Sequence, residues 1–563
     1  MIFITDEKRR PLLIGGLILF FMGIALVLRM IPALFIPNQG FLMNNGADVW
    51  YTMRQIEVMV AHFPQYNWFD PMTAYPVGKT IDWGPFYPFL AALLCLVLGA
   101  SSRPDIVNIS GWVIPILAAL MVPVTYKLGK LIWDGKAGII AAGFVSVISS
   151  VYFIQSSYGW TDHHVVEVFF VALFFLAYLS ALESARKSTD LKVPGTFISP
   201  LLFSGLAGIL YFFGYLTSPT VLLSLLVVAI ATFVQFSVDY IAGKRSEYLL
   251  IVNCLAFTCI LILEILFGFP GEGLSLTTYS IGHVYVMLTL IAETLFLYGL
   301  VKIFRNNRVH YFISLTGIIF GGMVLLQFLP QLQTIRDQAF SLVFGDSVYT
   351  IAIRETQSWT LSAAYGTFGL FLVLMAGGIL ILAWYAVKKR QGEQIFLLTW
   401  LIVMIILTIP HQRFEVYLAV PVALTAAICT AEIIRWSWSS VKDLFCSRFS
   451  YRYDPKKTPD TRIDTGKKDR KPRKAVKEPG TSSPITVIKG VILVAAIIIA
   501  LLAFVTSAVQ DYSYVAATPG NGIPKDWVES LGWMKTSTPP AGVDYFGTYD
   551  RHTFTYPNIS YTA

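Results

Sequence analysis

The stretch Tyr158-Gly159-Trp160-Thr161-Asp162-His163-His164 lies between two long apolar segments, residues 137–155 and 165–182. Ionisable side chains beside a membrane span are costly unless they bind or react with something. If the stretch is extended, Asp162 and His164 share one face and His163 points the other way. A carboxylate and an imidazole on one face suit a divalent cation, whereas the alternative is that Asp162 caps the following helix. This stretch alone leaves both interpretations open.

The rest of the chain has the composition of a membrane protein. Of its 563 residues, 55% are hydrophobic and only 13% are charged. This composition predicts an all-α polytopic membrane protein with about 13 transmembrane helices. The five cysteines have no spacing that indicates a disulfide framework or a zinc site. The predicted spans are 12–36, 106–126, 137–155, 165–182, 197–216, 219–239, 247–268, 280–301, 310–330, 361–387, 394–410, 413–435 and 486–509.

The distribution of Lys and Arg predicts the orientation of the chain. Loops that follow the even-numbered spans are basic, whereas loops 156–164 and 269–279 contain no Lys or Arg. Because basic loops stay in the cytoplasm, the N-terminus is predicted to be cytoplasmic. The segments predicted to lie outside are loops 37–105, 156–164 and 331–360 and the tail 510–563.

One further apolar run, residues 86–100, is only 15 residues long. A transmembrane helix needs about 20 residues. Counting this run as a span would also place every basic loop outside, against the positive-inside rule. We therefore expect an interfacial or re-entrant helix within the outer loop 37–105.

The chain divides by composition into a membrane part and a tail. Residues 1–509 are predicted to form the transmembrane domain, and residues 510–563 the start of an incomplete external C-terminal domain. Segment 451–480 contains eleven Lys or Arg and five Asp or Glu, which accounts for most of the net charge of +8. Residues 441–485 are therefore predicted to be a disordered basic cytoplasmic loop. Charge confined to one membrane face does not indicate a nucleic-acid partner.

Two acids in other outer loops are candidate functional residues. Asp48 follows a glycine soon after the first span, and its alternative role is a helix cap. Glu355 lies among apolar residues in loop 331–360, and its alternative role is an ordinary ion pair with Arg354 or Arg336. Each acid alone is better explained by its structural role.

Together the candidates suggest a metal site next to a phosphate site. Asp48, Asp162, His164 and Glu355 are all predicted to lie outside and close to span ends. Such a set suits Mg²⁺ or Mn²⁺. Arg413, at the same depth, either extends harmlessly to the interface or binds a phosphate. Because the site is at the bilayer surface, a lipid phosphate is the expected substrate group.

Four short motifs resemble the catalytic subunit of the oligosaccharyltransferase family, especially its single-subunit archaeal members. Their order and common side extend the resemblance over most of the chain. Gly46-Ala47-Asp48 is similar to the first acidic motif, and residues 158–164 to the second D-x-D motif in its archaeal D-x-H form. Ala352-Ile353-Arg354-Glu355 resembles the T-I-x-E motif with Ala in place of Thr, and Gln412-Arg413-Phe414 resembles the arginine motif that contacts the donor.

The resemblance implies a GT-C-type glycosyltransferase with large outer loops in the cell (plasma) membrane. Such an enzyme transfers an oligosaccharide from a lipid-linked (pyro)phosphate donor to asparagine in Asn-x-Ser/Thr of an acceptor polypeptide. Carried over residue by residue, Asp48, Asp162 and His164 hold Mg²⁺ or Mn²⁺. Asp48 and Glu355 act on the acceptor amide, and Arg413 and His163 bind the donor phosphate. The implied partners are the lipid-linked donor, the acceptor chain and the bilayer.

One departure from the family concerns the acceptor site. The family's external domain carries a W-W-D-Y-G motif that binds the Ser or Thr of the acceptor. The nearest string here, Asp544-Tyr545-Phe546-Gly547, lacks the tryptophans. We therefore expect a fragment, a separate chain that supplies the soluble domain, or a chain that is not active by itself.

Other functions remain possible from the sequence. A related transferase could use a polyprenyl-phosphate sugar to modify Ser, Thr or lipid. A transporter is less favoured, because the acids lie in outer loops and no paired interrupted helices occur in two halves. A non-catalytic membrane subunit that binds a soluble domain is a third alternative.

Overall fold

The computed structural model describes residues 9–34, 47–74, 77–148, 151–188, 194–271, 273–345, 356–450, 484–517, 525–539 and 542–555. This part of the chain is helical, apart from one antiparallel pair of short strands, β1 (Phe69–Asp70) and β2 (Lys79–Thr80). Glu355, residues 451–483 and the start of the outer loop at 37–46 lie outside the described residues.

The helices follow one another with short connections. In the first half they are α1 (Arg9–Met30), η1 (Ile31–Leu34), α2 (Ala47–Ala61), α3 (Phe86–Val97), α4 (Arg103–Ser110), α5 (Val113–Ile132), α6 (Gly135–Val147), α7 (Val151–Gln155), α8 (His164–Lys187), α9 (Pro194–Tyr215), η2 (Pro219–Val221), α10 (Leu222–Ala242) and α11 (Glu247–Phe267). In the second half they are α12 (Gly282–Ile303), α13 (Arg308–Phe328), η3 (Pro330–Leu332), α14 (Gln333–Phe344), α15 (Leu361–Phe368), α16 (Phe371–Lys388), α17 (Gly392–Thr408), η5 (Gln412–Leu418), α18 (Ala419–Ser450), α19 (Pro484–Ala517) and α20 (Lys525–Ser537).

The predicted polytopic membrane fold is confirmed. Among the described residues, eleven helices are long and apolar enough to cross a membrane. Two more predicted spans correspond to the shorter helices α6 and α17, of 13 and 17 residues. Helix α3 has 12 residues, which agrees with the expectation that the run 86–100 is too short to cross.

Several predicted elements differ from the structure in their boundaries. The span predicted over 137–155 ends at Val147, because Ile148 is extended, and the chain resumes as α7. The span predicted over 361–387 is divided at Gly369, whose positive φ of 49° ends α15. The disorder predicted over 441–485 is wrong at its start, because α18 continues to Ser450.

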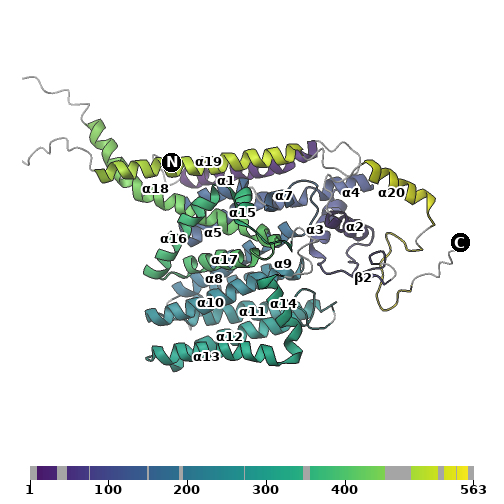
Figure 1. Ribbon diagram of the computed structural model, residues 1–563, viewed down its shortest axis with the longest axis horizontal. Coiled ribbons are helices and arrows are strands. Elements are labelled where there is room, and N and C mark those ends of the chain that lie inside the picture. The colour runs from purple at the N-terminus through teal and green to yellow at the C-terminus, as the bar shows by residue number, and fades with distance from the viewer. Residues whose placement is uncertain are drawn as a thin grey trace, which may run out of the picture.

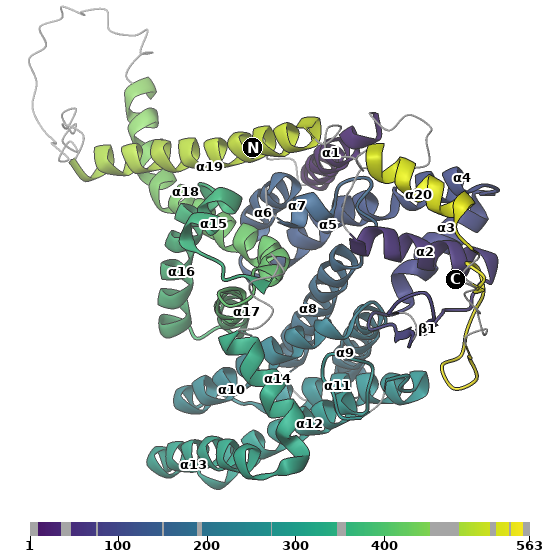
Figure 2. The same ribbon diagram turned by 45° about the vertical axis from the view of Figure 1, so that its right-hand side comes forward.

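The helices form a layered bundle with an appendage at one end. Helices α8, α11, α12 and α13 lie side by side in Figure 1, and α19 lies along α1. Helices α2, α3, α4 and α20 gather at one end of the bundle, as Figure 2 also shows. Helix α8 is apolar on all sides and packs against α5, α9 and α11, so it is a central helix. Its N-terminal end carries the motif Asp162-His163-His164.

The segment 542–555 of the tail packs against α2 and the small sheet. The Tyr545 hydroxyl donates to Glu57 Oε2 at 2.6 Å, and His62 Nε2 donates to Phe546 O at 2.7 Å. The backbone of Tyr549 pairs with that of Phe69. The string Asp544-Tyr545-Phe546-Gly547 therefore lies against α2, the helix whose first turn contains Asp48.

Candidate functional site

The loop before α8 is shaped by contacts with distant helices. Tyr158 N–H donates to Arg29 O at 2.9 Å, and Arg29 Nε donates to Ser156 Oγ at 2.6 Å. Gly159 has a φ of 90°, which a residue with a side chain rarely adopts. These contacts turn the chain so that residues 160–164 run back into the bundle.

A hydrogen bond joins this loop to α2. Thr161 Oγ1 donates to Val49 O at 3.1 Å, and Thr161 is fully buried. Asp48, the residue before Val49, lies in the first turn of α2 and is exposed. The structure thus brings the first acidic motif next to the second.

The motif residues Asp162, His163 and His164 form one cluster. A ligand atom from each lies within 4.8 Å of those of the other two. His163 Nδ1 is 2.7 Å from Asp162 Oδ1, and His164 Nε2 is 3.8 Å from Asp162 Oδ2. The expectation that His163 points away is wrong, because His163 has helical backbone angles, φ −79° and ψ −20°, rather than extended ones. Asp48 is not a member of this cluster among the described residues.

The capping alternative for Asp162 also differs from the structure. The N-cap residue of α8 is His163, and no side chain caps this helix. Asp162 Oδ1 instead accepts from the N–H of the next residue at 2.7 Å. Burial alone would raise the pKa of Asp162, but the two histidines outweigh it and hold this pKa well below its usual range. The group is therefore a carboxylate at neutral pH.

The sequence analysis missed Glu167, which lies one helical turn further along α8. Its Oε1 is 3.3 Å from His163 Nε2 and 3.6 Å from His164 Nδ1. Its Oε2 accepts from the Tyr417 hydroxyl and from Thr220 Oγ1, the latter at 2.8 Å. The spacing of three and four residues from the histidines is the sequence signal that indicates this contact.

Trp83 and Arg413 complete the surroundings of the cluster. The Trp83 ring stacks on the His163 ring with centroids 5.7 Å apart and an interplanar angle of 17°. Arg413 in η5 is exposed and lies one turn before Tyr417, whose hydroxyl donates to Glu167. The N–H of Gln412 donates to Gln357 O at 3.0 Å. The chain shortly after position 355 therefore lies beside the arginine motif, although Glu355 itself lies outside the described residues.

The cluster fits a divalent cation. Imidazole nitrogens and carboxylate oxygens are ligands that such cations accept. Within the described residues, His163 Nδ1 and Glu167 Oε1 are buried and complete no hydrogen bond of good geometry. A cation bound here would give the Asp162 carboxylate and the two imidazoles a common partner.

Glu167→Gln tests whether Glu167 orients the two histidines. We expect the affinity for Mn²⁺ to fall about 10-fold to 100-fold, the usual cost of losing such a supporting contact. Isothermal titration with Mn²⁺ measures the change. Glu183→Gln, on the same helix but in a partly exposed pair with Lys187, should leave the affinity unchanged. Equal affinities for the two variants would contradict the orienting role.

The chain is similar to one known protein family and to several known proteins. A family model described as "Oligosaccharyl transferase STT3, N-terminal" matches residues 16–335. Dolichyl-phosphooligosaccharide-protein glycotransferase 3 of Archaeoglobus fulgidus is 25% identical over 420 residues, covering 69% of this chain and 46% of that protein. The dolichyl-monophosphooligosaccharide–protein glycotransferase AglB of Haloferax volcanii is 23% identical over 620 residues, covering 93% of this chain and 56% of that protein. The chain thus spans about half the length of the curated relatives it matches.

Solved structures share the fold. The archaeal oligosaccharyltransferase AglB from Archaeoglobus fulgidus, in complex with an inhibitory peptide and a dolichol-phosphate, has a TM-score of 0.77 at 20% identity. That match covers 98% of this chain and 62% of the other. The Archaeoglobus fulgidus oligosaccharyltransferase in complex with Zn and sulfate has a TM-score of 0.68 at 20% identity, covering 96% of this chain and 59% of the other. These likenesses confirm the predicted all-α, GT-C-type membrane architecture.

Proposed function

The chain belongs to the oligosaccharyl transferase STT3 family, and from this premise we propose that it is a metal-dependent membrane glycosyltransferase. It transfers an oligosaccharide from a lipid-linked (pyro)phosphate donor to asparagine in Asn-x-Ser/Thr of an exported polypeptide. The observation that carries the proposal is the partly buried cluster Asp162-His163-His164 at the N-terminal end of α8. A solved relative with Zn and sulfate supports a divalent cation in this family.

The cluster defines the donor side of the reaction. Asp162, His163 and His164 would hold Mg²⁺ or Mn²⁺, with Asp48 as a further ligand from the neighbouring α2. When bound, the cation supplies positive charge that stabilises the leaving phosphate. Arg413 supplies a second positive group, because guanidinium pairs well with phosphate oxygens. We assign His163 to the cation rather than to the phosphate, since it lies between Asp162 and Glu167.

Asp48 and Glu355 act on the acceptor. The bond that forms joins the asparagine amide nitrogen to the anomeric carbon of the sugar. The bond that breaks joins that carbon to the phosphate oxygen, and the lipid phosphate leaves with the electron pair. The amide nitrogen is a poor nucleophile because its lone pair is delocalised. Carboxylates that accept hydrogen bonds from the amide N–H groups weaken this delocalisation and take up the proton that the nitrogen loses.

The site is proposed to face the outside of the cell membrane. The cluster lies at the N-terminal end of α8, whereas Arg186 and Lys187 lie at its C-terminal end. Because basic residues mark the cytoplasmic end of a span, the C-terminal end of α8 is cytoplasmic and the cluster is external. The N-terminus of the chain is then also cytoplasmic. This side also suits an acceptor polypeptide that has been exported.

Metal removal tests the proposed reaction. Purified protein is incubated with lipid-linked oligosaccharide and a fluorescent Asn-x-Thr peptide, and the glycosylated peptide is resolved on a gel. We expect EDTA to abolish the product and Mg²⁺ or Mn²⁺ to restore it, because the leaving phosphate loses its main charge partner. A Gln-x-Thr peptide is the control for acceptor specificity. Full turnover in EDTA would overturn the metal dependence, and modification of the Gln-x-Thr peptide would favour a transferase with another acceptor.

A further inference from the structure

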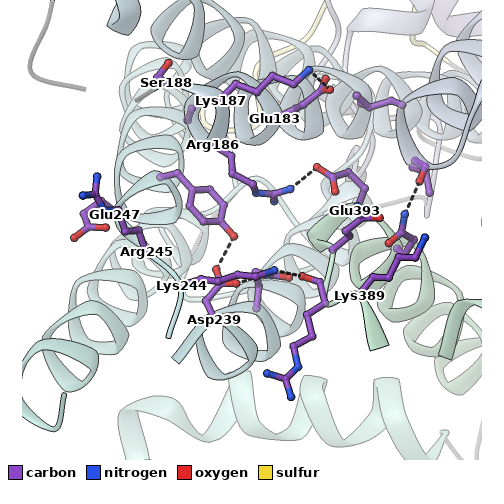
Figure 3. A pocket seen from close by; sticks show the side chains of 18 of the residues that line it. Glu183, Arg186, Lys187, Ser188, Asp239, Lys244, Arg245, Glu247, Lys389 and Glu393 are labelled. Atoms are coloured by element: carbon purple, nitrogen blue, oxygen red, sulfur yellow. Dashed lines mark hydrogen bonds and ion pairs between the residues drawn. The ribbon is translucent and has the colours of Figure 1, made fainter. Parts of the chain in front are cut away.

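A large cavity lies at the end of the bundle that is remote from the cluster. Its volume is about 1190 Å³, and it is enclosed by the ends of α5, α8, α10 and α16 and the starts of α11 and α17. Figure 3 shows charged side chains from these elements around it. Its charged lining consists of Glu183, Arg186, Lys187, Asp239, Lys244, Arg245, Glu247, Lys389, Arg390 and Glu393, and we call it the basic cavity.

The acids of the basic cavity already have partners within the protein. Glu393 accepts from Arg186 at 2.7 Å, and Glu183 accepts from Lys187 at 2.5 Å. The Asp239 carboxylate accepts from the hydroxyl of Tyr248 and from Gln235 Nε2, each at 2.8 Å. Glu247 pairs with Lys302, which lies outside the lining, at 2.8 Å. Each carboxylate of the basic cavity therefore already has a hydrogen-bond partner within the protein.

Four basic side chains of the lining remain, and they come from two neighbouring turns. In the described part of the chain, Lys244, Arg245, Lys389 and Arg390 form no ion pair with a carboxylate at hydrogen-bond distance. Lys244 Nζ donates to Arg390 O at 2.9 Å, which ties the turn after α10 to the turn after α16. Arg390 has a φ of 52°, a backbone conformation that is uncommon for a residue with a side chain. Such strain is often retained at binding sites.

An apolar groove of about 390 Å³ adjoins the basic cavity. Helices α10, α16 and α17, all predicted spans, form its walls, and Arg390 lines both spaces. Its other lining residues are Val234, Val238, Ile241, Ala386, Val387, Ile395, Leu398, Thr399 and Ile402. A charged space that continues into an apolar one at a helix end matches the shape of an amphipathic anion.

We propose that this composite site binds an anionic phospholipid, with its phosphate in the basic cavity and one hydrocarbon chain in the apolar groove. Lys and Arg bind phosphate oxygens strongly, and basic pockets between membrane helices bind lipid headgroups. A soluble phosphate would use the four cations but leave the groove unexplained. The site lies at the opposite end of α8 from Asp162, His163 and His164, so it is separate from the proposed transfer reaction.

The test measures binding of dioctanoyl phosphatidylglycerol to the delipidated protein in detergent by native mass spectrometry. Dioctanoyl phosphatidylcholine and inorganic phosphate are the comparison ligands. We expect phosphatidylglycerol to bind in preference to phosphatidylcholine. The double variant Lys244→Gln/Lys389→Gln should bind it about 25-fold more weakly, since each basic residue contributes roughly 1 kcal/mol to the attraction of an anionic lipid.

Two further variants separate the alternatives. Ala386→Trp fills the groove and should weaken the binding of phosphatidylglycerol while leaving the binding of inorganic phosphate unchanged. Arg305→Gln removes an exposed cation that does not line the basic cavity, and it should change the binding of neither ligand. Equal binding of the two lipids would overturn the proposal. It would also be overturned in favour of a soluble anion if phosphate bound as tightly as phosphatidylglycerol and Ala386→Trp had no effect.

Discussion

Asp162→Ala should lower the rate of glycan transfer about 1000-fold, because a bound cation supplies several kcal/mol of stabilisation to the leaving phosphate. Asp162 is the member of the cluster that contacts both histidines, at 2.7 and 3.8 Å. Its removal takes away one ligand and the charge that orients the other two. The initial rate of peptide glycosylation at saturating donor measures the loss. His164→Ala should have a similar effect.

Asp526→Ala is the matched control for this prediction. Asp526 is an exposed acid in the first turn of α20, at the same end of the bundle but outside the cluster. This variant should retain the full rate. A thermal unfolding curve for each variant separates loss of the site from loss of the fold. Wild-type turnover in a folded Asp162→Ala protein would remove this residue from the site.

Arg29→Ala should destabilise the protein by about 3 kcal/mol, because the variant lacks the fully buried guanidinium and leaves the acceptors of its hydrogen bonds unsatisfied. Arg29 donates to Ser156 Oγ, to Ala25 O at 3.2 Å and to Ser146 O at 3.0 Å. Its guanidinium also lies 4.7 Å from the centre of the Phe153 ring. The free energy of unfolding in mixed micelles of SDS measures the change.

Two further variants provide a comparison for the stability change caused by Arg29→Ala. Lys127→Ala removes an exposed cation of α5 and should change the stability by less than about 0.5 kcal/mol. Arg29→Lys keeps the charge but not the planar set of donors, so it should fall between the two. If Arg29→Ala were as stable as Lys127→Ala, Arg29 would not be what holds the loop before α8.

The membrane architecture was predictable because it depends on properties that are local in sequence. Runs of about 20 apolar residues identify spans whatever their neighbours are, and this is why α8 and α11 were placed correctly. Helix breaks inside an apolar run depend on single backbone angles. The break at Gly369 was missed for this reason, since most glycines in membrane helices do not interrupt them.

The site was predictable only where its residues are adjacent in sequence. Asp162 and His164 were recognised as a pair, but the direction of His163 depends on where α8 begins, and this cannot be read from the sequence. Trp83 and Tyr417 reach the cluster from segments far away in sequence. Nothing in the sequence around Trp83 or Tyr417 distinguishes them from the many aromatic residues of a membrane protein.

Helix α2 connects the cluster Asp162-His163-His164 to the tail segment 542–555. Its Val49 carbonyl contacts the loop that carries Asp162, and its Glu57, together with His62 just after the helix, contacts the tail segment 542–555. Val49 and Glu57 are about 12 Å apart along the helix axis. If a ligand at either end shifts α2 as one body, its binding changes the affinity at the other end. By reciprocity, whatever factor a ligand of the tail imposes on cation affinity, the cation imposes on that ligand.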